Sequence, residues 1–137
     1  VLLTGAEKEE IGIPVFDVTS APADFVAENA DLVAQFLAVT AEANAMWNEG
    51  SMQEEMIGVI AQDAGMTQDA TRDFMATFTF PSIEQQLSET WFGGNTEEFM
   101  KGVAGVFVEA GSIPSALDSY AQAVNVGPLE TAQSMSQ

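Results

Sequence analysis

The sequence predicts an α/β fold in which two strands are followed by about six helices. Two extended segments near the start, VLLTG at residues 1–5 and IPVFDVTS at residues 13–20, have the apolar, β-branched and aromatic composition of strands. From Pro22 onward the apolar spacing changes from two residues to the 3.6 residues of a helix. Of the 137 residues, 47% are hydrophobic, so the chain can bury a core.

The two predicted strands raise a problem of pairing. The first ends at Gly5, and the second has Pro14 near its start. Two strands do not make a stable sheet alone, since about three or more are usually needed. Either they pair with a part of the protein outside this chain, as we expect, or the strand predictions are wrong. The start on Val1, without Met, also suggests a fragment of a mature protein.

A short helix with Phe25 and Val26 facing inward is expected after Pro22, and a long helix should then run to Gly50. The inward stripe of the long helix is predicted to consist of Val33, Phe36, Leu37, Thr40, Asn44 and Trp47.

Four later helices have recognisable start signals. Ser51 with Glu54, and Asn95 with Glu98, match the capping-box pattern, in which two side chains bond the first backbone amides. Single caps are predicted at Thr67 and Ser82. Gly65 and Gly111 should end two of these helices.

The last predicted helix covers residues 113–124. The polar tail that follows Gly127 is expected to fray, because it offers few apolar anchors.

Charge excludes some partners. The chain has 21 Asp and Glu against three Lys and Arg, a net charge of −18 at pH 7. Nucleic acids and anionic membranes bind basic patches, so neither is expected as a partner. The acids form either a solubilising surface, which is the simpler interpretation, or an acidic docking face.

Catalysis is not expected. The chain lacks Cys and His, which removes disulfides, thiol nucleophiles, the usual zinc sites and the commonest general base. Paired acids such as Glu54 and Glu55 stand at helix starts, where they complement the helix dipole. We therefore predict no catalytic residue, no metal and no cofactor. No apolar run approaches the roughly 20 residues that span a bilayer.

Asp17 stands out, because it follows an apolar extended run and precedes the turn into the helices. It could simply cap a turn or a helix. Alternatively, it could lie at the mouth of a strand and face a cation, with Pro14 and Phe16 forming an apolar wall beside it.

Several segments resemble taurine-binding proteins, the periplasmic components of taurine ABC importers. GIPVFDVTSAPADF, at residues 12–25, is similar to their Gly-x-Pro-Thr-Phe-Asp segment and the turn that follows it. FTFPSIEQQLSETWFGG, at residues 78–94, and EAGSIPSALDSYAQAV, at residues 109–124, resemble two later family segments. The matches run in order over nearly the whole chain.

The resemblance implies the C-terminal part of a two-lobe type II periplasmic binding protein. Residues 1–10 would end the second lobe, residues 11–21 would form the hinge crossover strand, and residues 22–137 would be the C-terminal helical part of the first lobe. The remaining N-terminal part of the same protein would complete both lobes. A membrane permease of the ABC type would be the partner.

The resemblance also implies a ligand site. Taurine carries a sulfonate and an ammonium, and Asp17 would pair with the ammonium, beside Phe16 and Pro14. The family's anion clamp has no match here and is expected upstream of residue 1.

Some residues depart from the family pattern: Val15 replaces its usual Thr, and Ala23 its basic residue. These changes put the ligand in doubt more than the fold, since related proteins bind alkanesulfonates, nitrate or pyrimidine-type precursors. The alternative function is a free-standing acidic helical interaction module.

Overall fold

The computed structural model describes residues 7–8 and 17–135, and in these residues every regular element is a helix. The predicted α/β fold is therefore wrong for the described part of the chain, which contains no strand. The first predicted strand lies outside the described residues. Of the second, only residues 17–20 are described, and they are irregular because no neighbouring chain pairs with them there.

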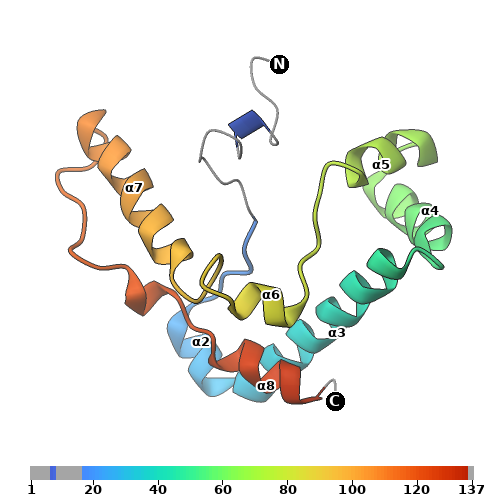
Figure 1. The fold of residues 1–137 in the computed structure, drawn as a ribbon, viewed down its shortest axis with the longest axis horizontal. Coiled ribbons are helices and arrows are strands. Elements are labelled where there is room, and N and C mark those ends of the chain that lie inside the picture. Colours follow the sequence, from blue (N-terminus) through green and yellow to red (C-terminus); the bar gives the residue numbers. More distant parts are fainter. Residues whose placement is uncertain (1–6, 9–16, 136–137) are drawn as a thin grey trace.

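Seven α-helices and one 3₁₀ turn are described, numbered as in Figure 1. In chain order they are α2 (Ala23–Glu28), α3 (Ala30–Glu49), α4 (Gln53–Ala64), α5 (Gln68–Met75), α6 (Ile83–Leu87), α7 (Asn95–Glu109), η1 (Ala121–Ala123) and α8 (Gly127–Met135).

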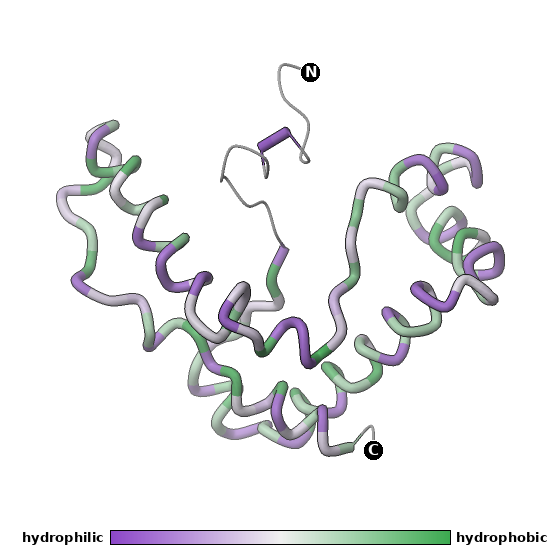
Figure 2. Tube along the Cα trace, in the orientation of Figure 1, coloured by the Kyte–Doolittle hydropathy of each residue, from purple (hydrophilic) through white to green (hydrophobic). Residues whose placement is uncertain are grey.

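The described helices form an open, U-shaped arrangement. Figure 1 shows α2, α3, α6 and α8 at the base, with α7 rising on one side and α4 with α5 on the other. Apolar stretches recur along both arms as well as the base (Figure 2). The apolar residues are thus spread over the helices and are not gathered into one central core.

The base is held by α8 against α3. Ala34 of α3 and Ala132 of α8 are both fully buried, and α8 packs along α3. Leu129 and Ala132 of α8 form one buried cluster with Ile83 of α6. Partly buried residues pack around this cluster: Leu37, Ala38, Ala41, Leu87 and Phe92.

This packing corrects two predictions. The tail after Gly127 does not fray: up to Met135 it forms α8, because Leu129 and Ala132 anchor it on α3. The face that α3 buries is the alanine-rich one, whereas Phe36, predicted to face inward, is 56% exposed. Larger apolar side chains on α3 would have held α8 further away.

The α4–α5 arm has its own small core, in which Ile57, Ala61 and Thr71 are buried. The Thr71 hydroxyl donates to the carbonyl of Thr67 at 3.0 Å, so its burial leaves no unsatisfied group. Thr67 is also the predicted cap of α5, and its hydroxyl accepts from the amide of Ala70.

The cap at Ser82 is confirmed, and it forms a full capping box with Gln85. The two predicted capping boxes are wrong. Helix α4 begins at Gln53, after a turn at residues 51–52, and α7 already includes Asn95, so in neither helix does a side chain cap the start. The glycine stops are confirmed: Gly50, Gly65 and Gly111 have positive φ.

The chain between α7 and α8 is mostly irregular, so the helix predicted over residues 113–124 is wrong except for η1. The irregular chain is instead held to α7 by the carboxylate of Glu97. Glu97 accepts hydrogen bonds from the Ser119 hydroxyl and from the Tyr120 amide, the latter at 3.1 Å. Led by the Ser119 bond, these contacts lower the pKa of Glu97 below its ordinary value of 4.5.

The described residues bury few large apolar side chains. Of the seven buried apolar residues in the described part, four are alanines. Large side chains such as Val39, Val59 and Val106 are more than 60% exposed.

Gly93 is expected to be irreplaceable in the turn after α6. A Cβ there would lie 2.8 Å from the carbonyl oxygens of Leu87 and Ser88, which are backbone atoms that cannot rotate away. We expect Gly93→Ala to lower the free energy of unfolding by about 1–3 kcal/mol, measured by urea denaturation followed by circular dichroism.

Gly102, inside α7, is the matched control, because a Cβ there meets nothing within 4 Å. Gly102→Ala should raise stability by about 0.5–1 kcal/mol, since alanine is the better helix former. Equal stability of the two variants would contradict the packing described for Gly93.

The Glu97 contacts predict an acid-dependent stability. Because the folded-state pKa of Glu97 is depressed, its contribution is present above the ordinary pKa of 4.5 and is lost as the pH falls through the lower folded value. Glu97→Gln and Ser119→Ala should therefore lose less stability than the wild type as the pH is lowered from 5 towards about 3. The control variant Glu98→Gln, in the same helical turn, should show the same dependence of stability on pH as the wild type. Parallel curves of stability against pH for all four proteins would show that the Glu97 contacts are not coupled to pH.

Candidate functional site

Asp17 is the only residue of the predicted ligand site that the structure describes. It is exposed, at the start of an irregular segment that leads into α2. Pro14 and Phe16, predicted to form the apolar wall, lie outside the described residues. The Asp17 carboxylate is therefore accessible to a ligand, and the apolar wall of Pro14 and Phe16 stays a prediction.

The segment after Asp17 turns sharply into the base of the molecule. The backbone N–H of Phe25 donates to Oδ1 of Asp24 at 2.9 Å. At the bend between α2 and α3, the Asn29 side chain donates to the carbonyl of Phe25, also at 2.9 Å. Both Asp24 and Phe25 are positions that match the family pattern, and here they shape the entry to α3.

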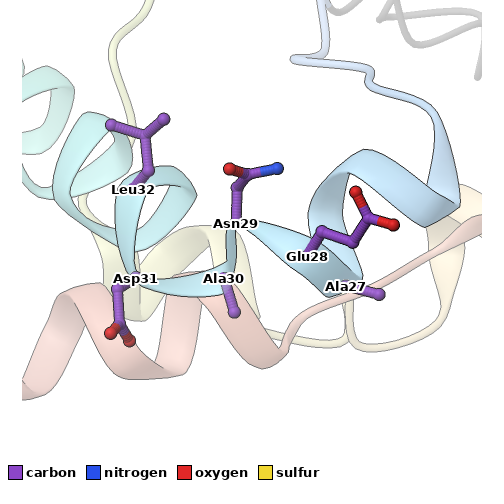
Figure 3. A pocket seen from close by; sticks show the side chains of 6 residues that line it. All are labelled: Ala27, Glu28, Asn29, Ala30, Asp31 and Leu32. Carbon is purple, nitrogen blue, oxygen red and sulfur yellow. The ribbon is translucent and has the colours of Figure 1, made fainter.

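A hollow of about 390 Å³ lies at this bend and is lined by six consecutive residues, 27–32. Figure 3 shows Asn29 and Leu32 pointing to one side of the bend, and Ala30 and Asp31 to the other. Side chains that diverge in this way do not converge on a bound molecule. The hollow is a feature of the bend and not a second wall for Asp17.

The electrostatics of this region favour a cation. Asp17, Asp24, Glu28 and Asp31 follow one another within 15 positions, and the chain has no Lys or Arg between Lys8 and Arg72. Such a stretch attracts an ammonium group and repels a sulfonate. An anion clamp must therefore come from elsewhere.

Arg72 is not free to serve as that clamp. Its guanidinium donates twice to the Glu54 carboxylate, at 2.8 and 3.3 Å, and once to Asp69 at 3.0 Å. These contacts, with the Glu54 hydrogen bond first, raise its pKa. Its helix, α5, also lies in an arm of the U, away from α2 at the base (Figure 1).

The later family-like segments have structural contacts in the described part of the chain. Residues 78–94 contain the capped helix α6 and the turn at Gly93, and Phe92 packs on the buried cluster. Residues 109–124 contain the stretch that Glu97 holds.

Two surface features were missed by the sequence analysis. Trp47, Phe74, Phe78 and Phe80 form a chain of ring contacts, with centroids 5.0–6.2 Å apart. A groove also runs along α3 beside α6 and α8. The spacing of the small residues Ala38, Ala41 and Ala45 was the one sequence signal for this groove.

The described residues contain no cluster of three or more His, Cys, Asp or Glu arranged to hold a metal ion. The described helices also include none with both the length and the apolar character needed to cross a membrane. What the Asp17 region can do chemically is to bind a cation by charge and hydrogen bonding.

Comparison with known proteins adds no relative, because no family model, curated protein or solved structure matches this chain.

Proposed function

We propose that this chain belongs to the substrate-binding component of an ABC importer, which captures taurine or a similar small sulfonate in the periplasm and delivers it to a membrane permease. The observation that carries the proposal is Asp17: an exposed carboxylate, in an acidic stretch without a cation, at the position where the resemblance to taurine-binding proteins requires an ammonium partner.

The charge of Asp17 explains how such a site would discriminate. Taurine brings an ammonium that replaces the water around the carboxylate, whereas an alkanesulfonate of the same length leaves the carboxylate without a partner. An unpaired, partly desolvated charge is costly, so the site would reject ligands that lack the amine.

The sulfonate end of the ligand needs a second set of groups. Arg72 is held by Glu54 and Asp69, so we assign the anion clamp to the remaining N-terminal part of the same protein. The exposed apolar side chains of α3 and α7 support such an additional partner, because they are surface that a larger assembly would cover.

A second candidate is a free-standing acidic helical interaction module. The all-helical architecture of the described residues favours it, as does the exposure of acids on most helices. This candidate requires the 137-residue chain to unfold cooperatively as a monomer by itself. Aggregation of the isolated chain, or a non-cooperative transition, would count against the module and would leave the transport proposal standing.

Asp17→Asn tests the transport proposal in the longest natural protein that contains these residues. Removing one partner of a hydrogen-bonded charge pair that ligand binding buries typically costs about 2–5 kcal/mol, so taurine binding should weaken at least about 30-fold. Isothermal titration calorimetry measures the affinity, with ethanesulfonate as the ligand that lacks the amine.

Asp31→Asn is the control, because it removes an exposed carboxylate of the same acidic stretch that has no assigned ligand role. It should leave taurine binding unchanged. Wild-type affinity in Asp17→Asn would remove Asp17 from the site. If the wild type binds ethanesulfonate as tightly as taurine, or binds neither, the taurine assignment fails.

A further inference from the structure

A groove of about 1020 Å³ lies along α3, where the first residues of α6 and the last residues of α8 rise beside it. Half of its twelve lining residues are small or apolar and half are polar or charged: Ala38, Val39, Ala41, Ala45, Ile83 and Met135, and Glu42, Asn44, Asn48, Glu49, Ser82 and Gln133.

The floor of the groove is the side of α3 that carries three alanines. Ala38, Ala41 and Ala45 recur on one side of α3 and leave room above the helix backbone. Met135 is 48% exposed and Val39 is 66% exposed. When a partner covers the apolar part of this surface, the complex is stabilised by about 25 cal/mol for each Å² of apolar area removed from water.

Two carboxylates are placed two turns apart along this floor. Glu42 and Glu49 are separated by seven residues, so they lie on the same side of α3 about 10 Å apart along its axis. Within the described residues, neither Glu42 nor Glu49 takes part in an ion pair, since the Arg72 pairs are with Glu54 and Asp69. The groove therefore joins an apolar floor to a pair of negative charges at a fixed spacing.

We propose that this groove docks an amphipathic helical segment of another protein, with apolar side chains on the alanine floor and two Lys or Arg side chains facing Glu42 and Glu49. A helix lying in a groove makes contacts at intervals of three, four and seven residues. Basic residues seven positions apart would match the spacing of the two carboxylates. The proposal does not depend on the transport function.

A second copy of this chain does not fit the groove. Its basic residues are Lys8, Arg72 and Lys101, and no two of them are seven positions apart. Arg72 is already held by Glu54 and Asp69. Each copy would also bring a net charge of −18, so self-association would set acid against acid.

The test uses a designed helical peptide of about 15 residues, with leucines on one face and two lysines seven positions apart along its edge. The comparison peptide has glutamates in place of those two lysines, which changes the charge but hardly the helix propensity. Binding of each labelled peptide to the 137-residue protein is followed by fluorescence anisotropy.

The lysine peptide should bind in the micromolar range, and the glutamate peptide much more weakly. The double variant Glu42→Gln, Glu49→Gln should weaken binding of the lysine peptide about 3- to 10-fold, as expected for exposed ion pairs. Ala45→Phe, which fills the floor, should abolish binding. The control double variant Glu55→Gln, Glu109→Gln makes the same change in net charge outside the groove and should leave the affinity close to that of the wild type.

Three outcomes would overturn the proposal. They are equal binding of the two peptides, no binding of the lysine peptide, and equal effects of the groove and control double variants. Sedimentation velocity supplies a further check, because a dimer that Ala45→Phe dissociates would make a second copy the occupant. Circular dichroism spectra establish that each variant keeps its helices.

Discussion

The contact between α3 and α8 is the constraint on which the rest of the described structure depends. Ala132 of α8 is fully buried, and Ala38 and Ala41 of α3 pack on the cluster that it forms with Leu129 and Ile83. Ile83 then fits against α8, which brings α6 and its capped turn onto the base. Both arms extend from this base, so a disturbance of the alanine contact would affect the position of every other element.

A core built largely from alanine buries little apolar area, so many of the larger apolar side chains remain exposed. Large apolar side chains on these helices stay exposed, among them Val39 of α3, Phe74 of α5 and Val106 of α7. Exposed apolar side chains of this size are surface that a partner could cover.

Negative charge sets the chemistry of the two surfaces to which we assign a role. At Asp17 an acidic stretch is open to a small cation such as an ammonium group, while the α3 groove offers two carboxylates at helical spacing. The two surfaces differ in form, one an exposed segment and the other an apolar groove. With so few basic residues in the chain, most of its carboxylates can be neutralised only by other molecules.

The sequence by itself determined the features that depend on a few neighbouring residues. The glycine stops at Gly50 and Gly65 and the caps at Thr67 and Ser82 are present in the structure, because backbone freedom and short-range hydrogen bonds decide them. For the site, the sequence identified Asp17 as an unusual carboxylate, but not its neighbours in space.

Only the tertiary structure decided which face of α3 is buried, that residues 127–135 form a helix, and that residues 17–20 are not a strand. Each of these depends on what lies opposite in space: α8 needs α3, and a strand needs a neighbouring strand. The groove was only partly within reach: its alanine floor and its two carboxylates all lie on α3 and follow from helical spacing, whereas its sides form only when α6 and α8 pack beside α3.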